Sequence, residues 1–106
     1  MQQEIWLRIY TTEAQRHHGS LLHEWLLETA RKHAIPGGTA FRAVAGFGRH
    51  GVLHEETFFE LAGELPMVVE FIVTPPQAAA LLDACKQENL RLFYLQIPVS
   101  HGITGA

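Results

Sequence analysis

The sequence is short of charge, of cysteine and of long apolar runs, and each shortage excludes a class of protein. Only 18% of its 106 residues are charged, and a formal net charge of −3 leaves no basic surface of the kind that binds nucleic acid. The single cysteine, Cys85, permits neither an internal disulfide nor a cysteine-based zinc cluster. No apolar run approaches the roughly 18 residues of a membrane span, and the start at Met1–Glu4 is not the basic start of a signal peptide. We therefore expect a soluble, cytoplasmic protein with a single domain over residues 1–106.

Catalytic motifs are missing as well. The chain has no G-x-S-x-G nucleophile elbow, and nothing in the sequence gives Cys85 a reason to meet a histidine. We therefore expect a protein that is not an enzyme and keep an enzyme as the third alternative after the two binding functions described below.

Apolar periodicity predicts six elements in the order βαββαβ. Alternation with a period of two predicts strands, and apolar residues three and four apart predict amphipathic helices. The predicted strands cover 4–11, 39–47, 66–73 and 91–99, and the predicted helices cover 20–33 and 74–89. Ser20 is expected to cap the first helix, Thr74 and Gln77 form a capping box for the second, and Asn89 suits a left-handed helix end. This order is that of the α+β, ferredoxin-like fold, a four-stranded antiparallel sheet with two helices on one face.

The third and fourth predicted strands are apolar on both faces. Val68 and Ile72 oppose Phe71, for example, whereas two helices can cover only one face of the sheet. The uncovered face would be a larger apolar patch than monomers normally expose. We therefore expect the chain to associate with copies of itself, sheet face against sheet face.

Three charged residues share the predicted open face by strand parity, namely Arg8, Arg42 and Glu70. Charges at such a place are not expected to be buried unpaired. They predict either an ion network within a subunit interface or, for Arg42, a bidentate contact with an anionic ligand.

The segment Gly46–Gly51 matches G-x-G-x-x-G, but no helix is predicted directly after it within a parallel βαβ unit, so a dinucleotide-binding fold is rejected. Glycines still allow backbone N–H groups to approach an anion, and Arg49 and His50 can add charge-assisted contacts. The simpler interpretation is a loop that needs positive φ angles.

Four of the seven histidines form two close pairs along the chain, and a metal ion is considered for one of these pairs. His50 and His54 are four residues apart on a predicted loop, followed by Glu55. His17 and His18 are adjacent, so we expect their side chains to diverge. The simpler interpretation is that these are ordinary surface or hydrogen-bonding histidines.

Several blocks together resemble a known family. They are Leu7–Tyr10, His18–Gly19, Gly38–Gly48, His54 and Leu65–Phe71, spread over nearly the whole chain. In this order they resemble the bacterial and archaeal family called domain of unknown function 190 (DUF190), which looks like a relative of the PII signal-transduction proteins.

The resemblance implies a PII-like homotrimer of ferredoxin-like subunits whose sheets face the centre. It also implies a regulatory role in signal transduction, with a nucleotide or another small anion bound between subunits and with the loop over 46–56 contacting a protein target. It names no cofactor. The expected ligand-binding residues are Arg42, Gly46, Gly48, Arg49, His50 and His54, and Arg8 and Glu70 are expected in an interface ion network. The alternative is a metal-binding module that resembles the divalent-cation tolerance proteins, with His50, His54 and Glu55 as ligands.

Overall fold

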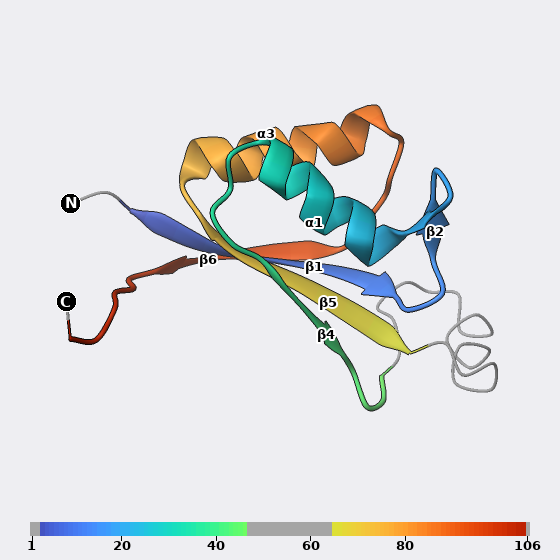
Figure 1. The fold of residues 1–106 in the computed structure, drawn as a ribbon, viewed down its shortest axis with the longest axis horizontal. Helices are drawn as coiled ribbons and strands as arrows, with labels where there is room; N and C mark the ends of the chain where they lie inside the picture. The colour runs from blue at the N-terminus through green and yellow to red at the C-terminus, as the bar shows by residue number, and fades with distance from the viewer. Residues whose placement is uncertain (1–2, 47–64, 106) are drawn as a thin grey trace.

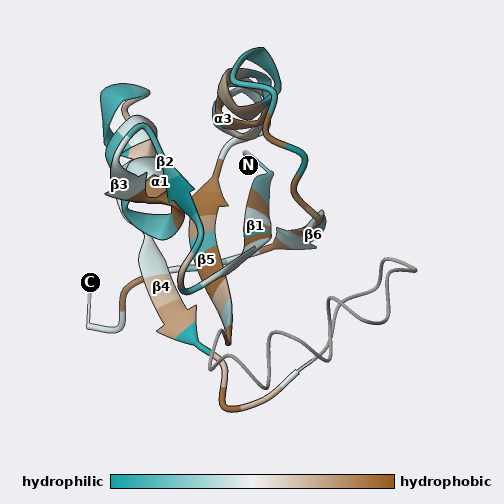
Figure 2. Ribbon diagram, turned by 90° about the vertical axis from the view of Figure 1, so that its right-hand side faces the viewer, coloured by the Kyte–Doolittle hydropathy of each residue, from teal (hydrophilic) through white to brown (hydrophobic). Residues whose placement is uncertain are grey.

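The computed structural model describes residues 3–46 and 65–105 and contains one main sheet with two helices packed on it (Figure 1). The elements are β1 (Glu4–Thr12), β2 (Arg16–His17), β3 (Ser20–Leu21), α1 (Leu22–Lys32), β4 (Thr39–Arg42), β5 (Pro66–Val73), α3 (Pro75–Gln87) and β6 (Tyr94–Val99). The main sheet has the order β4-β5-β1-β6, with antiparallel pairing throughout. Figures 1 and 2 show both helices on the same side of this sheet. The predicted α+β, ferredoxin-like fold is confirmed.

Local sequence explains how the two helices begin. Thr74 and Gln77 form the predicted capping box, since each backbone N–H donates to the other's side-chain oxygen, at 2.9 and 3.3 Å. At the first helix the prediction was wrong. Ser20 belongs to β3, the cap position is Leu21, and no side chain caps the helix. Ser20 and Leu21, where the helix was expected to begin, instead form the second strand of the short hairpin β2–β3.

Both helices end at a residue in the left-handed region. Ala34 has a φ of 63° and Asn89 a φ of 59°, and the next residue in each case donates its N–H back into the last turn. The predicted helix end at Asn89 is confirmed. Neither helix among the described residues is long and apolar enough to span a membrane.

The core lies between the helices and the sheet. Its largest fully buried side chains are Leu7, Ile9, Leu22, Leu26, Val69, Phe71, Val73 and Leu81. Glycine is required at position 38, directly before β4, because an added Cβ there would lie 2.5 Å from Cε1 of Phe71. The ring of Phe71 therefore packs against bare backbone at the edge of the core.

The opposite face of the sheet carries apolar side chains that the helices do not cover. Strand register aligns Trp6 with both Ile72 and Ile97, and Phe41 with Val68. Phe41 is 52% exposed, and Ile72 and Ile97 are each 39% exposed. We call this side of the sheet the open face.

The strand predicted over 39–47 ends at Arg42, and its facing was predicted wrongly. Arg42 lies opposite Met67, on the helix side of the sheet, whereas Phe41 lies on the open face. Because β4 is an edge strand, its end extends past the helices, and a charged side chain on their side stays 67% exposed. Arg42 is thus not part of the charge group on the open face.

Candidate functional site

Arg8 and Glu70 lie directly opposite each other on the open face and form an ion pair. The Arg8 Nε donates to a Glu70 carboxylate oxygen at 2.6 Å, and the guanidinium lies over the rings of Trp6 and Tyr10, 5.1 and 6.0 Å from their centroids. The hydrogen bond to Tyr10 raises the pKa of Arg8, desolvation opposes this, and the hydrogen bond to Glu70 raises it further. The structure thus brings together two predicted residues as a charge pair bordered by aromatic rings.

Arg42 and Gly46 lie where the described chain stops before residue 47 and near where it resumes at residue 65. The Arg42 Nε lies 2.9 Å from an oxygen of Glu13, and the other oxygen of that carboxylate accepts the N–H of Leu65 at 3.3 Å. A Cβ added to Gly46 would lie 3.1 Å from Cγ of Pro66. The Glu13 carboxylate therefore contacts the chain both before the segment 47–64, at Arg42, and after it, at Leu65.

Most of the predicted ligand set belongs to that segment. Gly48, Arg49, His50 and His54 lie outside the described residues, and so does Glu55 of the alternative metal site. The structure therefore places Arg42 and Gly46 and leaves the other four residues as predictions.

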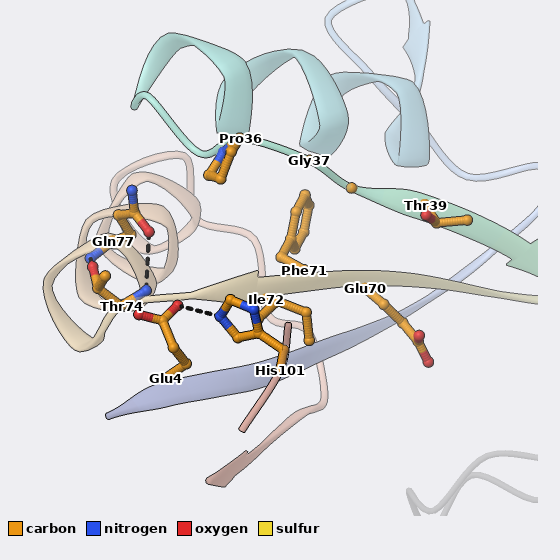
Figure 3. Close-up of a pocket in the computed structure, with 11 residues that line it drawn as sticks. Glu4, Pro36, Gly37, Thr39, Glu70, Phe71, Ile72, Thr74, Gln77 and His101 are labelled. Carbon is orange, nitrogen blue, oxygen red and sulfur yellow. Dashed lines mark hydrogen bonds and ion pairs between the residues drawn. The ribbon is translucent and has the colours of Figure 1, made fainter. Parts of the chain in front are cut away.

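A cleft of about 670 Å³ lies at the opposite end of β4 (Figure 3). It is lined by residues 36–39, 70–72, 74 and 77, with Glu4 and His101 joined by an ion pair of 3.4 Å. Its two carboxylates, Glu4 and Glu70, are already paired with His101 and Arg8, and the N-terminus of α3 is occupied by its own capping box. The residues that line the cleft therefore offer an anion neither an unpaired cationic side chain nor an open helix N-terminus.

His17 and His18 converge on one carboxylate, contrary to the prediction that their side chains diverge. Their Nε2 atoms lie 3.0 and 2.8 Å from the same oxygen of Glu88, at the C-cap of α3. The hydrogen bond with His18, followed by that with His17, lowers the pKa of Glu88. Within the described part of the chain these residues form a group whose ligand atoms lie within 4.8 Å of one another.

The sequence signal for this cluster was incomplete. His18–Gly19 forms the two-residue turn of the β2–β3 hairpin, and apolar periodicity alone does not predict it. The contact with Glu88 joins residues 70 positions apart, so no spacing rule reveals it.

Cys85 has no nucleophilic character in this fold. Its side chain is buried on the inner face of α3, and desolvation raises the pKa of the thiol to about 11. A neutral, buried thiol behaves as a small apolar side chain.

Comparison with known proteins places this chain among homologues over most of its length. The family model DUF190, described as "Uncharacterized ACR, COG1993", matches residues 4–91. The "UPF0166 protein" of Aquifex aeolicus (strain VF5) is 33% identical over 90 residues, which are 85% of this chain and 86% of the relative. "UPF0166 protein MJ1524" of Methanocaldococcus jannaschii is 29% identical over 66 residues, 62% of this chain and 60% of the relative.

Proposed function

The chain belongs to the DUF190 family, and from that premise we propose that it is a PII-like regulatory protein, a homotrimer that binds a small anion between its subunits. A nucleotide is the first candidate ligand. The fold class, the open face of the sheet and the exposed guanidinium of Arg42 each support one part of this proposal.

The open face is the observation that carries it. Phe41, Ile72 and Ile97 expose large apolar surfaces there, on the side of the sheet without helices. Among the described residues, the charges at the centre of this face are Arg8 and Glu70, which are already paired, so covering the face leaves neither of them without its partner. Another copy of the chain provides a surface of the same character, and closed symmetric association is the usual form of such contacts.

The anion site is assigned to the Arg42 end of β4. The Arg42 side chain is 67% exposed, and a guanidinium is suited to bidentate binding of a phosphate. Gly46 lies four residues further on, and Gly48, Arg49, His50 and His54 complete the proposed ligand set from the segment that follows. These residues combine positive charge with glycine backbone, as an anion site requires.

The Arg42–Glu13 ion pair links ligand binding to a regulatory signal. An anion that binds the guanidinium competes with the Glu13 carboxylate, which also accepts the N–H of Leu65. Exchange of partners at Arg42 would therefore change contacts on both sides of the segment 47–64. A protein target that binds this segment would therefore bind differently when the ligand is present.

The subunit interface is tested by Ile72→Asp, with Ile103→Asp as the matched control. Ile103 is 83% exposed in the C-terminal tail, so its change introduces the same charge away from the sheet. Native mass spectrometry is expected to find trimers for the unaltered chain and for Ile103→Asp, and monomers for Ile72→Asp. A chain that is monomeric at micromolar concentration would contradict the trimer.

The anion site is tested by Arg42→Gln, with Arg31→Gln as the matched control. Arg31 is also exposed and also forms a single ion pair, with Glu28 on α1. Isothermal titration with adenine and guanine nucleotides is expected to give at least tenfold weaker binding for Arg42→Gln and unchanged binding for Arg31→Gln, both variants remaining trimeric. A trimer that binds none of these nucleotides would remove the nucleotide from the proposal.

A further inference from the structure

The hairpin β2–β3 and the end of α3 bring two imidazoles and a carboxylate to one point. The His17 and His18 Nε2 atoms both approach the same oxygen of Glu88, and the two rings lie 4.1 Å apart between centroids. Three ligand atoms from two distant parts of the chain thus lie within 4.8 Å of one another. Two imidazole nitrogens with one carboxylate oxygen form the ligand set of a common type of zinc site.

The turn explains why neighbouring histidines face the same way. His18 has a φ of 52° and Gly19 a φ of 81°, the two positive angles of a type I′ hairpin turn. In an extended strand successive side chains point to opposite faces, whereas the left-handed conformation of His18 redirects its ring towards that of His17. The hairpin is also held by a hydrogen bond of 2.9 Å from Arg16 to the Gly19 carbonyl oxygen.

The two sides of the cluster are held independently of each other. The ring of Trp25 on α1 meets the ring of His17 edge-on at 4.9 Å, and the His17 side chain is only 14% exposed. Glu88 follows the last turn of α3, where its backbone N–H donates to the Ala84 and Cys85 carbonyl oxygens. The ring of His17 and the backbone of Glu88 are therefore positioned by packing and by backbone hydrogen bonds before any ion binds.

We propose that His17, His18 and Glu88 bind a divalent transition-metal ion, zinc being the best match, with its remaining coordination position open to solvent. Metal–ligand bonds of about 2.1 Å in a tetrahedral site separate ligand atoms by about 3.4 Å. The nitrogen-to-oxygen distances of 3.0 and 2.8 Å would therefore widen by about half an ångström, and all three ligand atoms already lie within 4.8 Å of one another. Magnesium and calcium prefer all-oxygen ligands, so two imidazoles select against them.

This site is separate from both predicted binding sites. It lies on the helix side of the sheet, in contact with α1 and α3, whereas the proposed subunit contacts use the open face. It also shares no residue with the alternative set His50, His54 and Glu55. A bound ion would tie the hairpin to the end of α3 and so stabilise the helix layer of each subunit.

The test uses two variants that leave the backbone undisturbed. His18→Asn keeps a residue that tolerates the left-handed region in a turn where Asn-Gly is preferred, and Glu88→Gln keeps the shape of an exposed side chain. Their matched controls are His33→Asn and Glu28→Gln, exposed residues of the same types at and near the end of α1. Circular dichroism checks that each variant is folded.

Equilibrium dialysis with Zn²⁺, and the visible absorption of bound Co²⁺, give the readout on the full chain. We expect one ion per chain, a Kd raised at least tenfold in His18→Asn and in Glu88→Gln, and an unchanged Kd in both controls. No binding by the unaltered chain would overturn the proposal. Binding that survives both site variants but is lost in His50→Asn with His54→Asn would also overturn it and assign the ion to the other histidines.

Discussion

The two faces of the central sheet differ in exposure although the same strands build both. On β5, Val69, Phe71 and Val73 face the helices and are almost completely buried. Between them, Glu70 and Ile72 point to the open face, where Ile72 remains 39% exposed. The helix side of the sheet is therefore packed within one chain, whereas the open face keeps large apolar side chains partly exposed, as the proposed association requires.

The largest expected difference between the faces is in the cost of truncating neighbouring residues. Phe71→Ala should lower the free energy of unfolding by about 3–5 kcal/mol, because it leaves a cavity under Gly38 in the closed core. Ile72→Ala, made in the background of Ile97→Asp so that the open face carries a charge and the chain is monomeric, should cost about 1 kcal/mol or less. Urea titration of both variants measures the difference. Equal costs would mean that the open face is as well packed within one chain as the core.

Local signals explain which parts of the fold were predictable. The capping box of Thr74 and Gln77 and the helix end at Asn89 depend on residues within one or two turns, so the sequence alone predicts them. Alternation likewise revealed the four main strands. The facing of Arg42 was predicted wrongly because alternation separates the two faces of a strand but does not say which of them the helices cover.

Contacts between distant segments were less accessible. Arg8 and Glu70 could be assigned to one face by parity, and their strands place them opposite each other. The convergence of His17, His18 and Glu88 needs both a left-handed residue and a contact over 70 positions, and neither follows from periodicity. The cluster of His17, His18 and Glu88 could therefore be identified only from the folded chain.

The next largest effect concerns the ion pair on the open face. A double-mutant cycle combines Arg8→Met with Glu70→Gln. Both changes remove a charge, and methionine keeps an unbranched apolar side chain beside the Trp6 ring. In the associated protein we expect a coupling of about 2 kcal/mol, because a covered pair interacts strongly. In the Ile72→Asp background, with the face exposed, the coupling should fall below about 1 kcal/mol. The same coupling in both backgrounds would show that the pair is not covered by association.

The smallest expected effect concerns the sealed side of the sheet and appears at alkaline pH. Because burial raises the pKa of Cys85 from 9.0 to about 11, the folded state holds its thiol proton more tightly than the unfolded chain does. The stability that this contributes is present below pH 9 and is lost between pH 9 and 11, by about 1 kcal/mol at pH 10. Urea titrations at pH 8 and pH 10 measure this loss, and Cys85→Ala corrects for the tyrosines and lysines that also titrate there. An equal loss in Cys85→Ala would mean that water reaches the thiol, and that the helix side of the sheet is less completely closed than its buried side chains indicate.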